Sequence, residues 1–184
     1  MGALPEVGPH IPVTNQLDLQ LMHDFGVERI WLSPELSLIQ IEELGEMSPV
    51  PLGLTIMGAQ EMMVTEHCLL MSQGPCNQDC ENCTRRKSPH YLKDRKGYEL
   101  PVITDCTGRS HLYNAVSLDV AHAVPDLIKA GVSALMVDTT LMNVSEVGKM
   151  VARAVRARDI ALKGGNRVSK AEGATSGHLF RGVS

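Results

Sequence analysis

The residues with the clearest capacity for chemistry are the cysteines clustered between positions 68 and 83. Four of the five cysteines in the chain fall within these sixteen residues, at Cys68, Cys76, Cys80 and Cys83, with seven, three and two residues between them. Thiolates at such short spacings on one flexible loop suit a zinc ion or an iron–sulfur cluster, because both prefer sulfur ligands. The pattern therefore predicts a metal centre on this loop.

Free thiols and disulfides are the other uses that these cysteines leave open. Residues 1–12 have neither the basic start nor the apolar core of a secretory leader, so we expect the chain to be cytoplasmic. In that reducing compartment clustered cysteines are more often metal ligands than disulfides. Cys106 stands alone after an apolar run, and we expect it to be a thiol buried in the core.

Cys76, Cys80 and Cys83 also have the spacing of the radical S-adenosylmethionine motif, in which three cysteines hold a cluster and the open iron binds the cofactor. Asn82 stands where that motif has an aromatic residue, and several strands are expected before it. Cys68 would complete the coordination of the fourth iron, and a fully ligated cluster cannot bind the cofactor. We therefore favour a centre with four protein ligands.

Length and composition predict one soluble domain, residues 1–184, with no apolar run long enough to cross a bilayer. Charge is unevenly distributed along the chain. Residues 1–84 carry twelve acidic side chains and the single basic residue Arg29, whereas residues 85–184 carry sixteen basic and nine acidic side chains. This asymmetry makes an anionic partner plausible for the second half. Aromatic residues at 3% argue against a stacking platform for single-stranded nucleic acid.

The elements that must position the cysteines alternate between strand and helix patterns. We expect strands at residues 10–14, 27–33, 51–57, 62–65, 98–104, 132–137 and 177–183, and helices that begin near Asn15, Ser37, Ser117 and Asn143. Glycines should end the first two helices, at Gly26 and Gly45. This order predicts an α/β fold of parallel βα units. Residues 58–96 have no sustained period, so we expect an irregular, cysteine-rich insertion there.

Several short motifs occur in the order and spacing of a known family. They are SPELS (33–37), MVTEHC (63–68), LKDRKG (92–97), LPVITD through GR (100–109), YNA (113–115) and GHLFRGV (177–183). On these motifs the chain resembles the peptidase U32 family from about residue 15 to residue 183, most specifically over 63–114. The match is to the carboxyl-terminal part of that family's catalytic domain. The resemblance implies a partial (β/α)-barrel and a fragment of a longer protein.

The resemblance also implies a chemistry. The family was labelled as peptidases and collagenases of unknown catalytic type. Its better-understood members are oxygen-independent hydroxylation factors for tRNA, ribosomal RNA or ubiquinone precursors, and they carry a 4Fe-4S cluster on four cysteines. Carried over to this chain, the ligand region contains Cys68, Cys76 and Cys80, with Cys83 as the fourth ligand and Cys106 as its alternative.

Polar residues at strand ends are candidates for substrate contact. Glu35, Arg109, His111, Asn114 and Asp138 all follow expected strands, and the carboxyl ends of parallel barrel strands face the active site. We therefore expect Arg109 and His111 to be catalytic and Glu35, Asn114 and Asp138 to bind substrate, although each also fits a turn or a cap.

The pair Glu66 and His67, next to the first cysteine, could serve as acid and base or simply orient the ligand loop. Basic residues follow the cysteines at 85–87 and 93–96. They either balance the charge of a thiolate cluster or contact RNA phosphates.

Three functional hypotheses remain. The first is an iron–sulfur protein that supports hydroxylation of RNA or a small precursor. The second is a module stapled by zinc or a cluster, without catalysis, that works with the remainder of the barrel or another subunit; a homo-oligomer is left open. The third is a genuine peptidase, which the absence of a nucleophile elbow and of an HExxH motif disfavours.

Overall fold

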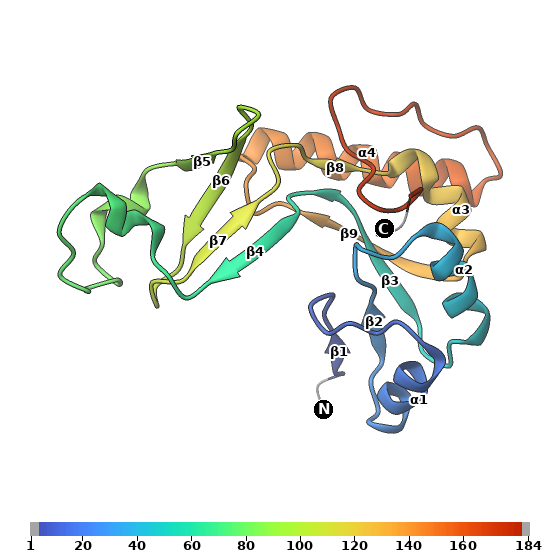
Figure 1. Cartoon of the computed structure of the whole chain (residues 1–184). Coiled ribbons are helices and arrows are strands. Elements are labelled where there is room, and N and C mark those ends of the chain that lie inside the picture. The colour runs from blue at the N-terminus through green and yellow to red at the C-terminus, as the bar shows by residue number, and fades with distance from the viewer. Residues whose placement is uncertain (1–3, 182–184) are drawn as a thin grey trace. The chain divides into compact units, whose positions relative to one another are not determined.

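The computed structural model describes residues 4–181 and divides the chain into two compact units. The first unit is made of residues Met1–Gly58 and Leu118–Ser184, and the second of residues Ala59–Ser117. Figure 1 labels their elements along the chain. Among the described residues, no helix has both the length and the apolar character that a bilayer crossing requires.

The first unit is built on a five-stranded sheet. Its strands are β1 (Glu6–Val7), β2 (Arg29–Trp31), β3 (Leu52–Gly58), β8 (Leu118–Asp119) and β9 (Val132–Asp138). Strands β1, β2, β3 and β9 pair in that order and are all parallel, whereas β8 runs antiparallel to the end of β3. Strands β1, β2 and β3 follow one another in sequence with a helix between each pair, as in successive βα units, whereas the second unit and β8 come before the chain returns as β9. The predicted parallel α/β architecture is therefore confirmed, and the described residues do not close into a barrel.

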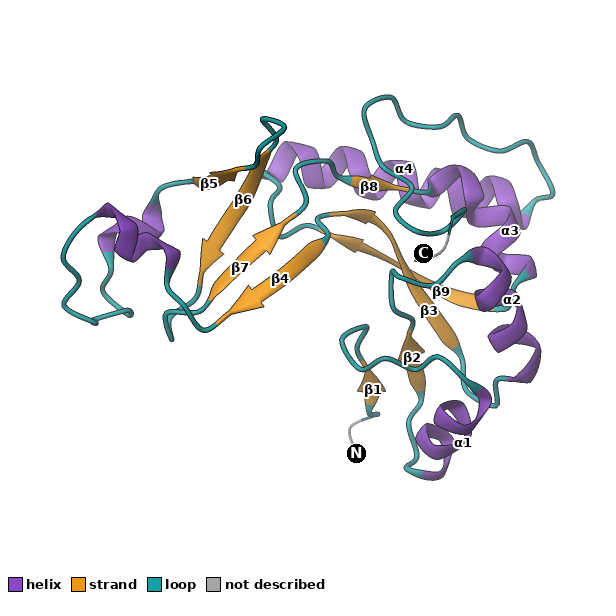
Figure 2. Cartoon of the chain, in the orientation of Figure 1, coloured by secondary structure: helices purple, strands orange, loops and turns teal. Residues whose placement is uncertain are grey.

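Four helices accompany these strands, shown in purple in Figure 2. They are α1 (Gln16–Asp24), α2 (Leu38–Met47), α3 (Val124–Lys129) and α4 (Val144–Leu162). Local caps begin α1, α2 and α4 as predicted. The Oδ1 atom of Asn143 accepts the amide of Glu146 at 3.0 Å, while the Glu146 carboxylate accepts the amide of Asn143 at 2.8 Å. Asn15 caps α1 in the same way through the amide of Asp18.

The core of the first unit lies around β3. Leu52, Leu54, Ile56 and Met57 are each at most 4% exposed, although they are close together along the strand. A parallel strand that is covered on both faces reads as a continuous apolar run, which is why residues 51–57 were recognisable from sequence. Each such side chain contributes roughly 1.5–3 kcal/mol on burial.

Three expected elements of the first unit are wrong. Residues 9–10 form a turn closed by the amide of Ile11, which donates to the carbonyl of Gly8, and residues 12–14 are irregular; the short strand lies earlier, at β1. Pro12 has no amide proton to give to a neighbouring strand. The helix expected from Ser117 begins only at Val124, where Pro125 fits the first turn. Residues 177–181 form turns, and residues 182–184 of the expected last strand lie outside the described range.

The second unit contains a separate antiparallel sheet in the order β4-β7-β6-β5. Its strands are β4 (Glu61–Thr65), β5 (His90–Lys93), β6 (Glu99–Thr104) and β7 (Ser110–Tyr113). Strand β4 agrees with the strand expected at residues 62–65, whereas β5 lies in the part of region 58–96 that was expected to be irregular. The irregular part is thus shorter, residues 66–89, and it contains two 3₁₀ turns, η1 (Leu69–Gln73) and η2 (Thr84–Lys87).

Two hairpins of the second unit use the same turn. In each, an aspartate is followed three residues later by a glycine with positive φ: Asp94 with Gly97, and Asp105 with Gly108. The aspartate Oδ1 accepts backbone amides two and four residues on, at 2.8–2.9 Å from Asp94 and 2.8–3.0 Å from Asp105. The carboxylate thus accepts hydrogen bonds from backbone amides that have no carbonyl partner in the turn, and the glycine adopts the left-handed backbone conformation that the turn requires.

Candidate metal centre

The loop of residues 66–89 carries the cysteine cluster and is anchored at its start. It leaves the carboxyl end of β4, and the amide of Leu69 donates to the Oγ atom of Ser110 on β7 at 2.9 Å. Ser110 is fully buried, and its hydroxyl lies 3.3 Å from that of Thr104 on β6. Cys68 and Cys83 precede the two 3₁₀ turns, so each stands at the entrance of a short turn of fixed geometry.

Four cysteines line one cavity in the second unit: Cys68, Cys76, Cys80 and Cys83. Its other lining residues are Leu70, Met71, Asp79, Arg85, Arg86 and Thr104. The cavity volume is about 20 Å³. That volume is close to one water-sized sphere, so the lining side chains would have to separate to accept a larger group.

Cys106 does not line this cavity and is exposed. The expectation of a buried core thiol there is therefore wrong. Cys106 follows Asp105 in the turn between β6 and β7, where its side chain is exposed and the contacts of the turn are made by the backbone and by Asp105.

The thiols affect one another electrostatically. The pKa of Cys80 is raised, first by desolvation and then by the negative charges of Cys68, Cys76 and Cys83, while Arg86 acts in the opposite direction. Thiolates that repel one another across a cavity are stabilised when a cation binds between them.

The donor types present fit a thiolate-bound inorganic group, since four sulfurs surround one space. In residues 4–181 no three histidine, cysteine, aspartate or glutamate side chains are arranged to hold a metal ion. The sulfurs thus surround the cavity without meeting at one point. Their role as ligands stays a prediction.

Arg85 and Arg86, the first residues of the basic run, are engaged with the loop itself. The Arg85 guanidinium donates to the carbonyls of Leu70, Gly74 and Pro75 at 3.0–3.2 Å. Arg86 donates to the carbonyls of Thr104 and Cys80 at 2.8 and 2.7 Å. The basic side chains that remain exposed around the β5–β6 hairpin are Lys87, Lys93, Arg95 and Lys96.

A second polar cluster involves several residues predicted to be catalytic. The Nδ1 atom of His111 lies 2.5 Å from a carboxylate oxygen of Glu61, and its Nε2 atom lies 3.6 Å from Asp105. Arg109 approaches Asp105 at 3.4 Å and the exposed Glu66 at 3.9 Å. The structure therefore brings Glu66, Arg109 and His111 into one network.

Asp105 is the centre of that network. Hydrogen bonds from the Thr107 hydroxyl and from the amides of Arg109 and Thr107, together with His111, hold the pKa of Asp105 well below its usual range. Its carboxylate therefore stays charged, and it both shapes the turn and faces His111.

The other predicted site residues are separate from this network. His67 is exposed, and its amide donates to Thr65 Oγ1. Asn114 follows β7, and its amide donates to the carbonyl of Gln60 at 2.9 Å. Glu35 and Asp138 belong to the first unit, after β2 and at the end of β9, with β3 between those strands. Their predicted roles in substrate binding stay predictions.

Sequence reasoning missed the residues that support the cysteines and the imidazole. Glu61, Gly108 and Ser110 were not singled out, because their contacts depend on the register between β4, β6 and β7. The turn role of Asp105 could have been recognised from the Asp-x-x-Gly pattern in the sequence, which also occurs at Asp94.

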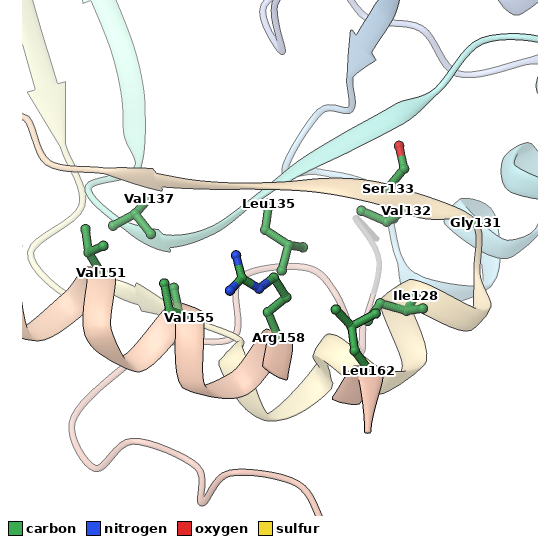
Figure 3. Close-up of a pocket in the computed structure, with 11 residues that line it drawn as sticks. Ile128, Gly131, Val132, Ser133, Leu135, Val137, Val151, Val155, Arg158 and Leu162 are labelled. Carbon is green, nitrogen blue, oxygen red and sulfur yellow. The ribbon is translucent and has the colours of Figure 1, made fainter. Parts of the chain in front are cut away.

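A larger cavity lies in the first unit, between β9 and α4. Its volume is about 640 Å³, and Figure 3 shows Leu135 and Val137 of β9 directed toward Val151 and Val155 of α4. Its lining is mainly apolar, and among the residues that the structure describes Arg158 is the one charged side chain in the lining. The cavity therefore offers packing surface and few groups for chemistry.

Comparison with known proteins agrees with the sequence motifs. Two curated relatives, both called tRNA hydroxylation protein P, come from Helicobacter pylori strains J99 and 26695. Each is 26% identical in an alignment of 148 positions that covers 72% of this chain and 35% of the relative. The chain thus spans about a third of the length of these relatives. No solved structure matches. Residues 7–178 match the family described as Peptidase family U32, and the chain belongs to this family.

Proposed function

We propose that this chain is the iron–sulfur-binding part of a U32 protein that supports oxygen-independent hydroxylation of tRNA. Cys68, Cys76, Cys80 and Cys83 would hold a 4Fe-4S cluster. The observation that carries the proposal is that these four cysteines line a single cavity, while the fifth cysteine does not. The name of the two relatives, tRNA hydroxylation protein P, supports hydroxylation as the proposed reaction and tRNA as the proposed substrate.

The chain's own residues would provide binding, orientation and proton handling. A bound cluster supplies one-electron transfer, which a peptide chain without a cofactor lacks. Arg109 is suited to pair with an anionic substrate group, since its guanidinium is 45% exposed. His111, held by Glu61 on one side and facing Asp105 on the other, is suited to accept or donate a proton.

The exposed basic residues near the β5–β6 hairpin provide the RNA-binding part of the proposal. Lys93, Arg95 and Lys96 lie within four positions and are exposed. Such side chains bind phosphates through counterion release, largely without sequence preference. They would position the RNA, and the substrate base would be selected elsewhere in the whole protein.

The cofactor is tested by metal analysis of the chain purified without oxygen. We expect a brown protein with about four iron and four sulfide per chain. A colourless protein with about one zinc per chain would instead support the stapled, non-catalytic module. A protein with neither metal would contradict both forms of the proposal.

The ligand set is tested by single substitutions with an internal control. Cys83→Ser should lose most of the bound iron, because serine oxygen is a poor ligand for a cluster. Cys106→Ser should retain the wild-type iron content, because Cys106 lies outside the cavity. The reverse result would assign the fourth ligand to Cys106.

The RNA partner is tested by tRNA binding at increasing salt. Replacing Lys93, Arg95 and Lys96 by glutamine should weaken binding and reduce the slope of log affinity against log salt by about 2–3. The matched control replaces Lys149 and Arg156, exposed on α4, by glutamine. Affinity that hardly changes between low and moderate salt would rule out this phosphate contact.

A further inference from the structure

The two arginines that line the cysteine cavity have an unusual set of partners. Arg85 and Arg86 donate to five backbone carbonyls between them. Within residues 4–181 no carboxylate forms an ion pair with either guanidinium. The nearest acid in the cavity wall, Asp79, accepts the backbone and side-chain amides of Asn82. Two positive charges therefore stand beside four thiols without a compensating carboxylate.

Arg85 fixes the first half of the loop. Its Nη1 atom reaches Leu70 in η1 and Gly74 just after it, and its Nη2 atom reaches Pro75, the residue before Cys76. One planar group thus joins the end of the 3₁₀ turn to the segment that carries the second cysteine. A guanidinium with several fixed donors is suited to this role, because its fork is rigid.

Arg86 fixes the second half. It joins the carbonyl of Cys80 to that of Thr104, the last residue of β6. Cys80 is thereby tied to the most regular part of the second unit. A lysine has its three donors on one nitrogen, so it lacks the separate Nε and Nη1 donors with which Arg86 reaches the two carbonyls.

The backbone of Arg85 is itself held in place. His90 Nε2 lies 2.6 Å from the carbonyl oxygen of Arg85, and His90 Nδ1 lies 3.1 Å from Gln73 Nε2. In this arrangement His90 donates to the carbonyl and accepts from the glutamine amide. The chain Gln73–His90–Arg85 connects η1 and η2 to strand β5, so the sheet of the second unit helps to hold Arg85 in place.

We propose that Arg85 and Arg86 are positioning residues that hold the cysteine loop around its cavity. Their positive charges would also balance the negative charge of an anionic, thiolate-bound group in that cavity. The identity of the group as a cluster rests on the proposed function; the holding of the loop does not. Charge-assisted hydrogen bonds to carbonyls are among the stronger ones in proteins, so each arginine should make a measurable contribution to loop order.

Loop order is tested by hydrogen exchange on the metal-free full chain. Peptides that cover residues 70–83 should exchange about tenfold faster in Arg85→Gln and Arg86→Gln, the change expected from losing charged hydrogen bonds. Arg86→Lys keeps the charge and removes the fork, so it should show most of the same increase. Arg95→Gln, which removes an exposed charge in the β5–β6 turn, should leave the loop at the wild-type rate.

Two controls keep the result interpretable. Peptides from β4 and β7 report on the sheet of the second unit and should exchange at wild-type rates in every variant, which separates local loosening of the loop from unfolding of that unit. If a glutamine variant does not fold, Arg86→Lys alone carries the comparison. Wild-type exchange over residues 70–83 in the variants would overturn the proposal.

Charge balance is tested on the protein loaded with iron and sulfide. Arg86→Gln should move the midpoint potential of the cluster to a more negative value, because a nearby positive charge stabilises the reduced, more anionic form. Arg86→Lys should stay near the wild-type potential, and so should Arg95→Gln. Equal potentials in wild type and Arg86→Gln would contradict the charge-balancing role. A wild type that binds no iron would defeat the proposed function, whereas the exchange comparison would still decide whether the arginines hold the loop.

Discussion

Gly45 in α2 and Ala130 at the end of α3 approach each other so closely that no side chain fits between them. A Cβ atom built on Gly45 would lie 1.9 Å from the carbonyl oxygen of Ala130. Gly45 was expected to end its helix, but α2 continues to Met47. Glycine is needed here because the two helices make contact at this point. Within a helix glycine is less stable than alanine, so the close contact lowers the intrinsic stability of α2.

Gly45→Ala should therefore destabilise the first unit by roughly 1–3 kcal/mol, since the helices must separate to accept the methyl group. Gly148→Ala is the matched control, because Gly148 also lies within a helix but has no atom within 4 Å of a built Cβ. That change should stabilise the protein by about 0.5–1 kcal/mol through helix propensity. Urea unfolding of both variants measures the difference, and equal effects would disprove the close contact.

Arg153→Ala should destabilise the first unit by about 3 kcal/mol. Arg153 donates to both carboxylate oxygens of Asp119, at 2.7 and 3.3 Å, and to the carbonyl of Ser169. Asp119 is only 3% exposed, so removing the guanidinium leaves a buried carboxylate without its cation. Arg156→Ala, on the exposed side of the same helix, should stay within about 0.5 kcal/mol of wild type. Thermal melts of the two variants give the comparison.

Asp105→Asn should lower stability in a way that depends on pH. The pKa of Asp105 is lowered in the folded state, chiefly by the Thr107 hydroxyl, so the unfolded chain binds the proton more tightly than the folded chain. The stabilisation is complete above the unfolded pKa of about 3.9 and disappears as the pH falls through the folded value. The difference in Tm between wild type and variant should be constant from about pH 7 to 5 and shrink below about pH 4.

A difference in Tm that grows toward acid pH would reverse the sign and refute this account of Asp105. Asp94→Asn makes the same change in the sister turn, where no histidine or arginine of residues 4–181 forms an ion pair with the carboxylate. At pH 7 the loss of Tm in Asp94→Asn measures the effect of losing the turn's amide contacts alone. Any larger loss in Asp105→Asn then measures the contribution of the Asp105 network.

Gly108→Ala should disturb Cys80 specifically. Gly108 has φ of +88°, and a built Cβ lies 3.0 Å from the Cys80 sulfur. Gly97 has the same φ of +88°, but its built Cβ lies 3.9 Å from the nearest atom, in the Lys93 side chain. Both alanine variants should lose about 1–2 kcal/mol from backbone strain. Only Gly108→Ala should change the rate at which Cys80 reacts with an alkylating reagent, measured by mass spectrometry of the metal-free protein.

Local signals made much of the fold predictable. The caps at Asn15 and Asn143 lie within four residues of their partners, and the run 51–57 is apolar on both faces, so each could be recognised from a short window. Strand β5 was missed because three of its four residues are exposed, which leaves no apolar alternation. The ending of α2 was misjudged because the role of Gly45 depends on α3, which is distant in sequence.

The same distinction applies to the site. The cysteines were recognisable by composition and spacing alone. The sequence could not show that Cys83 lines the cavity and Cys106 does not. This difference arises because Cys106 is exposed in the turn after β6. The engagement of Arg86 with the carbonyls of Cys80 and Thr104 could not be predicted, because a basic run looks the same whether it faces solvent or a backbone.

The contact between Gly108 and the Cys80 sulfur also has a use in comparing distant family members. Cysteine spacing can drift through insertions in an exposed loop, which makes ligand positions hard to align. Both the left-handed backbone at Gly108 and the neighbouring Cys80 sulfur disfavour any larger residue at this position, which lies in the short turn between β6 and β7. In divergent sequences, this glycine offers a reference point from which the equivalent of Cys80 can be located before any ligand is assigned.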